Sequence, residues 1–207
     1  MHQKNLWQET SKEKIAFGNL TKSITTDLVV IGGGFTGCSA ALFAAKSGLS
    51  VTLIDQKIGY GGSGRNVGLV NAGLWMPPEK VESILGLDAG SKLNNALASA
   101  PDLVFSLIDS NQINCSANRS GTLHCAHSEK GLKDLQLRFK QLSKRGADLE
   151  LLDKQQTQQR IGSSEFFGSL FNKKAGVINP LAYCFGLARA AKSLSLIHIS
   201  EPTRPMN

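Results

Sequence analysis

Hydrophobic and polar positions near the amino end of the chain predict a strand, a helix and a second strand. Asp27–Ile31 is a short apolar run rich in β-branched residues, which predicts a strand buried on both faces of a parallel sheet. Apolar positions then recur at helical spacing, and Gly48 predicts the end of that helix. These positions are Cys38, Ala41, Leu42 and Ala45. Ser50–Ile54 is the second predicted strand, and Asp55 follows it directly, so a β-α-β unit is expected.

The rest of the chain predicts helices mixed with short strands. Two helices are predicted over Glu79–Leu85 and Asp88–Asp109, and Pro101 is expected to kink or split the second one. The later expected elements are a strand over Thr122–Ala126, a helix from Ser128 to Gly146, a strand over Leu149–Leu152, a short helix from Asp153 to Ile161, strands over Gly168–Phe171 and Gly176–Ile178, and a helix over Leu181–Lys192.

The turn after the first strand carries a possible phosphate-binding motif. Residues 32–37 read G-G-G-F-T-G and fit G-x-G-x-x-G, with Gly32 allowing the tight turn, Gly34 the approach of a pyrophosphate and Gly37 close helix packing. Asp55 lies 18 residues after Gly37, near the position of a carboxylate that binds an adenosine ribose. An ordinary glycine turn is the alternative, but strand, helix and acid together favour dinucleotide binding.

A second glycine-rich loop follows over residues 59–68. It has five glycines in ten positions, which would be costly in a packed element because glycine loses much entropy on ordering. Ser63, Arg65 and Asn66 add a hydroxyl, a guanidinium and an amide, groups suited to phosphate oxygens and the polar edge of a ring. We interpret the loop as backbone that approaches a ligand, with a flexible surface hairpin as the alternative.

Composition narrows the class of protein. The chain has 207 residues, of which 41% are hydrophobic, and this composition excludes a disordered protein. Its net charge of +7 is scattered along the sequence, which favours a solvated basic surface over nucleic-acid binding. No apolar stretch approaches a membrane span, and no signal peptide is expected at the amino end.

The cysteines and histidines do not predict a metal site. The four cysteines, at positions 38, 115, 125 and 184, form no C-x-x-C pair, so structural thiols in a reduced, cytoplasmic protein are expected. His124, Cys125 and His127 could be imagined as ligands, but on a strand the two histidines would point to opposite faces.

The two glycine motifs together carry a family resemblance. Asp27–Gly37, Asp55 and Ser63–Gly68 resemble the amino half of the FAD-dependent amine and amino-acid oxidoreductases, the superfamily of D-amino-acid oxidase, glycine oxidase and sarcosine oxidase. The likeness is greatest to the gamma-glutamylputrescine oxidoreductase-like branch, in which the second loop commonly reads Ser-Gly-Arg-Asn. It runs from about Leu6 to about Lys192.

The resemblance implies a set of FAD contacts. Gly32, Gly34, Thr36 and Gly37 would contact the pyrophosphate, and Asp55 the adenosine ribose. Ser63, Gly64, Arg65, Asn66 and Gly68 would run along the phosphates towards the flavin ring. Covalent relatives attach the flavin through a histidine or cysteine, and this loop has neither, so FAD is expected to be held non-covalently.

The resemblance also implies an α/β fold, in which a Rossmann-like FAD-binding domain carries an inserted α+β substrate domain. The expected parts are an arm over 1–26, the first part of the FAD-binding domain over 27–111, part of the substrate domain over 112–179, and a return helix over 180–193. Residues 194–204 resemble a translated sequencing adapter, so 194–207 is expected to be a non-native tail on a truncated chain.

The implied activity is oxidation of the C–N bond of an amine or amino acid, with transfer of a hydride to the flavin and hydrolysis of the resulting imine. A small-molecule substrate is the expected partner, and no residue of this chain is assigned a catalytic role. Two alternatives stay open: an NAD(P)-dependent oxidoreductase, and a truncated, non-catalytic fragment that binds a dinucleotide. The sequence indicates no oligomeric state.

Overall fold

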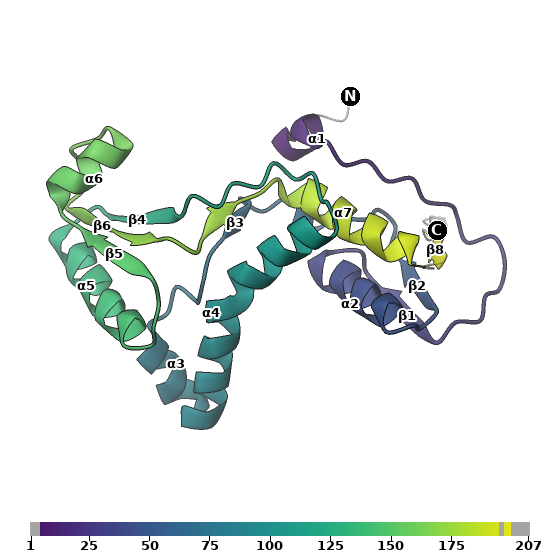
Figure 1. Cartoon of the computed structure of the whole chain (residues 1–207), viewed down its shortest axis with the longest axis horizontal. Helices are drawn as coiled ribbons and strands as arrows, with labels where there is room; N and C mark the ends of the chain where they lie inside the picture. The colour runs from purple at the N-terminus through teal and green to yellow at the C-terminus, as the bar shows by residue number, and fades with distance from the viewer. Residues whose placement is uncertain (1–4, 195–196, 200–207) are drawn as a thin grey trace, which may run out of the picture. The chain divides into compact units, whose positions relative to one another are not determined.

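The computed structural model describes residues 5–194 and 197–199. It divides into two compact units (Figure 1). The first comprises Met1–Gly68, Ser106–Ala117 and Ile178–Asn207, and the second Leu69–Phe105 and Asn118–Val177. Most of the tail expected over 194–207 lies outside the described residues.

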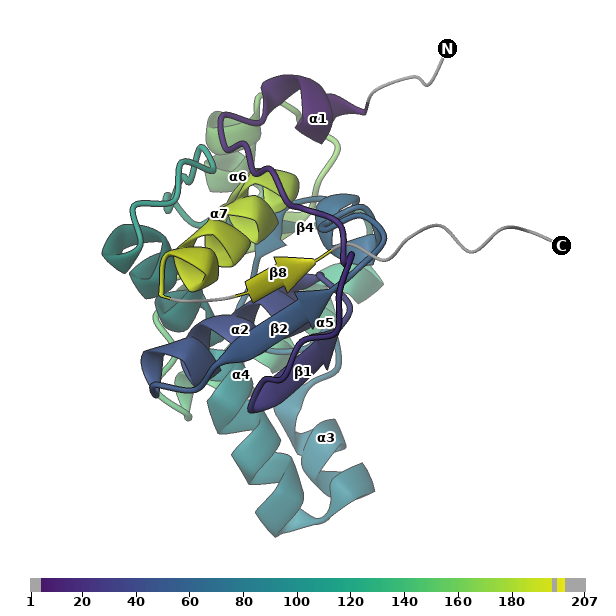
Figure 2. The same cartoon turned by 90° about the vertical axis from the view of Figure 1, so that its right-hand side faces the viewer.

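The first unit is built on a parallel sheet and the helix that joins its first two strands. The strands are β1 (Leu28–Ile31), β2 (Val51–Ile54) and β8 (Ile197–Ile199), and Figure 2 shows them side by side in the order β1-β2-β8. The connecting helix, α2 (Phe35–Lys46), buries the stripe expected from the sequence, Cys38, Ala41, Leu42 and Ala45. Gly48 has a φ of +83°, as expected after a helix end. The predicted β-α-β unit is confirmed.

The strand β1 is less buried than the sequence predicts. Val29 is 51% exposed and Ile31 85% exposed, so the expectation that β1 is buried on both faces is wrong. Only the other face of β1 is covered, since Val30 approaches Gly37 of α2. The central strand β2 is the buried one, with Val51, Thr52 and Leu53 all enclosed. Among the described residues nothing covers the face of β1 that carries Val29 and Ile31, so its apolar run is only half covered.

The helix α7 (Pro180–Ser193) packs against α2 and is buried along most of its length. Asn179 caps its first turn by accepting a hydrogen bond from the Ala182 amide at 2.9 Å, and Pro180 takes the first helical position. Gly186 lies against Ile113, so closely that an added Cβ would be 2.2 Å from Cγ2 of that side chain. Glycine is therefore required where these segments meet.

The amino-terminal arm contains one helix and is held to the rest of the first unit by hydrogen bonds. It contains a short helix, α1 (Leu6–Thr10), that begins at a capping box formed by Asn5 and Gln8. Farther along the arm, Glu13 is only 8% exposed and accepts two hydrogen bonds from the Arg189 guanidinium, each at 3.0 Å. The Asn114 amide donates a third bond at 2.8 Å. This buried carboxylate fastens the arm to α7.

The environment of Glu13 also changes its titration. Burial raises the pKa of this carboxyl, but the hydrogen bonds from Arg189 and Asn114 lower it, and the net pKa lies below the ordinary value of 4.5. The bonds thus favour the charged form.

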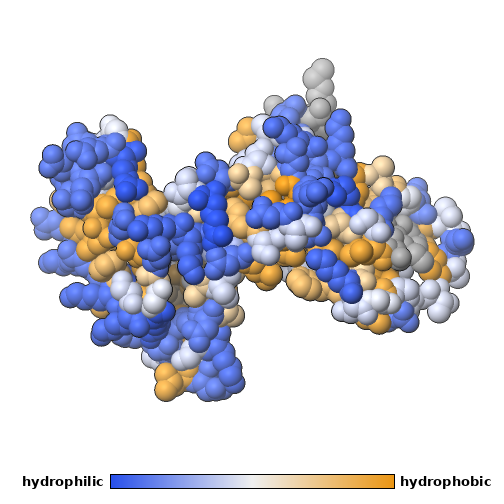
Figure 3. All heavy atoms as spheres, in the orientation of Figure 1, coloured by the Kyte–Doolittle hydropathy of each residue, from blue (hydrophilic) through white to orange (hydrophobic). Residues whose placement is uncertain are grey.

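The second unit contains an antiparallel sheet in the order β4-β6-β5 (Figure 1). Its strands are β4 (Thr122–Ala126), β5 (Leu149–Leu152) and β6 (Gly168–Asn172), and its helices α5 (Glu129–Ser143) and α6 (Lys154–Ile161) begin after the caps Ser128 and Asp153. Ala126, Leu135 and Leu170 form the centre of its core. Figure 3 shows that the surface of α6 is hydrophilic, and only Thr157 of this helix is buried.

The remaining elements of the second unit include a long helix and a second small sheet. β3 (Leu69–Val70) and β7 (Gly176–Val177) pair antiparallel, and α3 (Pro78–Leu85) precedes α4 (Leu87–Ser110), which continues into the first unit. Of the two effects expected of Pro101, a kink or a split of the helix, the split is wrong, because α4 continues through it. Pro101 is fully buried, and the helix continues although proline has no amide hydrogen to donate. No helix in the described ranges is long and apolar enough to cross a membrane.

Gly186→Ala should lower the free energy of unfolding of the chain by about 1–3 kcal/mol, because the added methyl group overlaps Ile113. Urea unfolding followed by circular dichroism measures the change. The matched control is Gly131→Ala in α5, where a Cβ would find ordinary contacts and should raise stability by about 0.5–1 kcal/mol. Equal effects of the two substitutions would contradict the assigned contact.

Glu13→Gln should destabilise the chain at pH 7, and its difference from the wild type should shrink as the pH falls below 4.5. A carboxyl whose pKa is lowered by folding contributes stability above its unfolded pKa and loses it as the pH falls through the folded pKa. Unfolding measured from pH 3 to pH 7 checks this. The exposed Glu165→Gln is the control, and a constant difference across the range would refute the role of the Glu13 charge.

Candidate functional site

The first glycine turn lies at the carboxyl end of β1. Gly32 has a φ of +103°, and its amide donates to the Ile54 carbonyl at 2.8 Å, which continues the pairing of β1 with β2. A Cβ on Gly37 would be 1.8 Å from the Gly32 carbonyl oxygen. Both ends of the motif therefore require glycine, one for its backbone angle and one for the close approach of α2.

The peptide groups of Gly33 join this turn to three other segments. Its amide donates to Oδ2 of Asp55 at 2.5 Å. Its carbonyl accepts from the Gly59 amide at 2.9 Å and from the Cys184 thiol at 3.2 Å. Oδ1 of Asp55 also accepts from the Lys57 amide at 2.8 Å. Asp55 thus orders the turn, while its two oxygens retain lone pairs for further donors.

Two buried thiols support the same carbonyl. Cys38 of α2 and Cys184 of α7 are fully buried, with 3.8 Å between their sulfur atoms. The hydrogen bond with Cys184 and burial both raise the pKa of Cys38, so it stays a thiol. Since Cys184 donates to Gly33, Cys38 is the donor towards the Cys184 sulfur. The expected structural thiols therefore have a defined place beneath the glycine turn.

The amino end of α2 faces the second glycine loop. Gly34 occupies the cap position and offers no side chain, and Ser63 of the second loop accepts a hydrogen bond from the Phe35 amide at 2.9 Å. A Cβ on Gly34 would be 2.8 Å from Oγ of Ser63. Thr36 is exposed in the first helical turn. The structure thus brings the two sequence motifs into direct contact.

Asn66 orders the second loop from within. Its Nδ2 donates to the Ser63 carbonyl at 2.6 Å, and its Oδ1 accepts from the Gly68 amide at 2.8 Å. Gly64 is buried in the 3-10 turn η1 (Gly62–Gly64), where a Cβ would be 1.9 Å from the Gly59 carbonyl oxygen. The side chain of Arg65 is exposed. The amide of Asn66 therefore serves the loop itself, while Arg65 remains accessible to a ligand.

Gly68 closes the loop. It has a φ of +79°, and a Cβ there would be 2.3 Å from the carbonyl oxygen of Ile178. Sequence reasoning missed the contribution of Cys184, because it lies in no motif and is 151 residues from the turn that it contacts. Gly59 belongs to the predicted loop, but its hydrogen bond to Gly33 was not predicted.

The arrangement has the features of a site for a long, phosphate-bearing ligand. A helix amino end offers partial positive charge, and a carboxylate stands at the end of the next strand. At Gly32, Gly61 and Gly62 an added Cβ would meet nothing within 4 Å, so bare backbone borders open space on both loops. These residues fit the pyrophosphate and ribose of a dinucleotide.

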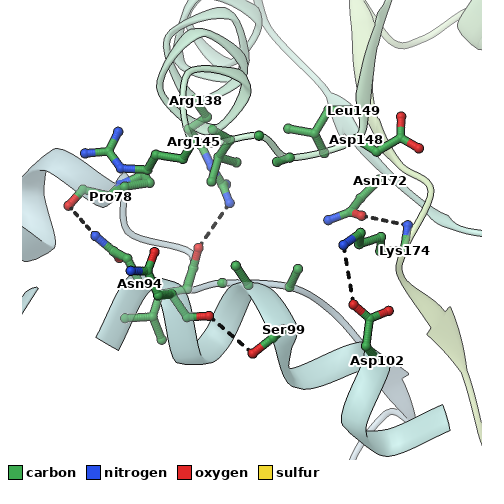
Figure 4. Close-up of a pocket in the computed structure, with 18 of the residues that line it drawn as sticks. Pro78, Asn94, Ser99, Asp102, Arg138, Arg145, Asp148, Leu149, Asn172 and Lys174 are labelled. Carbon is green, nitrogen blue, oxygen red and sulfur yellow. Dashed lines mark hydrogen bonds and ion pairs between the residues drawn. The ribbon is translucent and has the colours of Figure 1, made fainter. Parts of the chain in front are cut away.

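The second unit has a cavity of about 230 Å³ between α4 and α5 (Figure 4). Its polar groups bind one another: Lys174 lies 3.4 Å from Asp102, and Asn94 donates to the Pro78 carbonyl at 3.1 Å. Arg145 pairs with Glu82 at 2.8 Å. Because these groups are paired within the chain, the cavity does not by itself indicate a substrate.

His124 contacts neighbouring side chains in the second unit. Its Nδ1 lies 3.3 Å from Arg138, and its ring meets Trp75 edge to face. Burial and the charge of Arg138 lower the pKa of His124. Among the described residues, no group of three or more histidine, cysteine, aspartate or glutamate side chains could hold a metal ion.

Comparison with known proteins agrees with this fold. The sequence matches the family described as FAD dependent oxidoreductase, DAO, over residues 27–200. It is 30% identical over 193 residues to the gamma-glutamylputrescine oxidoreductase of Escherichia coli K12, covering 92% of this chain and 45% of that protein. The chain spans about half the length of the three curated relatives that are 30% identical to it.

Solved structures show the same fold at lower identity. Glycine oxidase from Geobacillus kaustophilus superimposes with a TM-score of 0.69 at 20% identity, covering 84% of this chain and 46% of that one. L-alpha-glycerophosphate oxidase from Mycoplasma pneumoniae, solved with FAD bound, gives a TM-score of 0.69 at 18% identity, covering 86% and 45%. The expected α/β, Rossmann-like fold is confirmed. With its glycine turn, its carboxylate and a family match over most of its length, the chain belongs to the DAO family of FAD-dependent oxidoreductases.

Proposed function

We propose that the first unit binds FAD non-covalently along the two glycine loops. The observation that carries the proposal is the hydrogen bond from the Phe35 amide to Ser63, because it places both loops at the amino end of one helix. In this proposal Gly32, Gly34, Thr36 and Gly37 contact the pyrophosphate. The carboxylate of Asp55 accepts hydrogen bonds from the adenosine ribose.

The second loop extends the proposed site towards the flavin ring through Ser63, Gly64, Arg65, Asn66 and Gly68. The exposed guanidinium of Arg65 can reach phosphate oxygens, for which its planar set of donors is well suited. Gly64 and Gly68 let the backbone take a path that a side chain would block. Asn66 contributes by holding that path. The absence of histidine and cysteine from residues 59–68 supports a non-covalent cofactor.

We further propose that the whole protein oxidises the C–N bond of a small amine or amino acid. The family match and the likeness to gamma-glutamylputrescine oxidoreductase support this substrate class, and the second unit would form part of the substrate domain. When bound, the flavin supplies the redox chemistry by accepting a hydride from the carbon beside the nitrogen. The residues of this chain would hold and orient it. The free thiols of all four cysteines support a place in the reducing cytoplasm.

Titration of the purified full chain with FAD and, separately, with NAD tests the cofactor. We expect FAD to bind, with quenching of its fluorescence and a shifted flavin spectrum, and NAD to bind more weakly. A chain that stays colourless in excess FAD, or that prefers NAD, would refute the proposal.

Asp55→Ala should weaken FAD binding by about 1.5–3 kcal/mol, the value of a charge-assisted hydrogen bond, which is about 10- to 150-fold in Kd. Isothermal titration calorimetry measures the change. Asp88→Ala is the matched control, since Asp88 is an exposed residue that pairs with Lys92 in the other unit. Unchanged affinity in Asp55→Ala would remove this carboxylate from the ribose site.

Ser63→Ala should lower the free energy of unfolding by about 0.5–2 kcal/mol, since it leaves the Phe35 amide without its cap, and it should also weaken FAD binding. Ser128→Ala removes a comparable cap from the amino end of α5 and should lower stability by a similar amount with FAD affinity unchanged. Loss of FAD affinity in both variants would mean that stability alone accounts for the effect.

A further inference from the structure

The amino-terminal arm touches the second glycine loop directly. Nε1 of Trp7 donates a hydrogen bond to the Asn66 carbonyl at 2.8 Å, across 59 residues of sequence. An indole nitrogen is only a donor, so this bond has one polarity and requires the carbonyl to face the arm. The arm thereby fixes the peptide group that follows Arg65 and Asn66 in the proposed cofactor loop.

Asn179 binds the arm next to Trp7. Its Nδ2 donates to the Trp7 carbonyl at 3.2 Å and to Oγ1 of Thr10 at 3.0 Å. Its Oδ1 caps α7 through the Ala182 amide. Asn179 is only 4% exposed, so one buried amide side chain joins the arm to the start of α7.

The other end of the loop segment is held by the residue before Asn179. The Ile178 amide donates to the Gly68 carbonyl at 2.9 Å. Residues 66–68 are therefore fastened at both ends, by Trp7 at Asn66 and by Ile178 at Gly68. A glycine-rich loop has much conformational freedom to lose, so bonds from outside the loop determine how well it keeps one conformation.

The arm also borders the carboxylate end of the site. Together with the segment after β2 and with α7, it lines a cavity of about 450 Å³ that reaches Asp55. The arm contributes Glu13, Lys14, Ile15 and Phe17 to this lining. Both regions assigned to FAD, the loop at Asn66 and the carboxylate at Asp55, thus lie beside the same arm.

We propose that Trp7 is a positioning residue for cofactor binding, and that the arm over residues 5–17 is a strap that holds Ser63–Gly68 in its binding conformation. This inference rests on the proposed FAD site. The hydrogen bonds of Glu13 with Arg189 and of Lys192 with the Ala16 carbonyl anchor the strap farther along, so losing the Trp7 bond frees the loop without detaching the arm.

The test uses Trp7→Phe in the full chain, which keeps an aromatic ring and removes the donor. Its Kd for FAD should rise about three- to tenfold, the effect of one uncharged hydrogen bond. Trypsin without FAD gives a second readout, because cleavage after the exposed Arg65 should be faster when the loop is loosened. Mass spectrometry follows that cleavage site alone. The control is Trp75→Phe, which changes the second tryptophan of the chain and lies in the other unit. It should alter neither the Kd for FAD nor the rate of cleavage after Arg65.

The outcomes separate this inference from the cofactor assignment. Wild-type chain that does not bind FAD refutes the proposed function, and faster cleavage after Arg65 in Trp7→Phe would still support the strap. Unchanged cleavage in Trp7→Phe overturns the strap, whatever the FAD affinity. If Trp7→Phe does not fold, Thr10→Val is the second variant, since it removes one acceptor of Asn179 and should accelerate the same cleavage.

Discussion

The peptide groups on either side of Gly33 are the constraint on which the first unit depends. The Gly33 amide donates a hydrogen bond to Asp55, directly after β2. The Gly33 carbonyl accepts hydrogen bonds from the start of the second loop and from a thiol of α7. Each partner comes from a different part of the sequence, so the turn is correct only when all three segments are in place. The shape of the proposed cofactor site therefore depends on the assembled unit, and an isolated motif would not have it.

The two glycine loops depend on each other through the amino end of α2. Ser63 caps a helix to which it does not belong, and the helix has no cap of its own because Gly34 occupies that position. A serine or aspartate at position 34 has a side chain that can cap a helix locally, but its Cβ would lie 2.8 Å from Oγ of Ser63 and would displace the cap that the second loop supplies. The second loop thus caps α2 through Ser63, and Gly34 leaves no side chain at the amino end of the helix.

Local signals in the sequence predicted much of this structure. The stripe on α2 and the caps at Ser128 and Asp153 depend on neighbours within a few residues, so they were predicted correctly. The exposure of Val29 and Ile31 could not be predicted, because it depends on what covers β1 in space and not on its apolar composition. The continuity of α4 through Pro101 likewise could not be predicted, because proline inside a helix ordinarily kinks or breaks it.

For the candidate site, the sequence motifs predicted which residues lie close together better than they predicted the hydrogen bonds that those residues make. The glycine positions follow from backbone requirements that the motif encodes, whereas the hydrogen bonds of Asn66 with its own loop become visible only in three dimensions. The contact of Trp7 with Asn66 spans 59 residues, and the contact of Cys184 with Gly33 spans 151. Nothing in the local sequence marks such distant partners.

The outer position of β1 in the described sheet has a consequence for handling the protein. One side of this strand presents a row of backbone donors and acceptors beside the apolar side chains of Val29 and Ile31. Such an edge is a template for the extended segment of another polypeptide. Low sample concentrations are therefore a sensible precaution against strand addition at this edge in solution work.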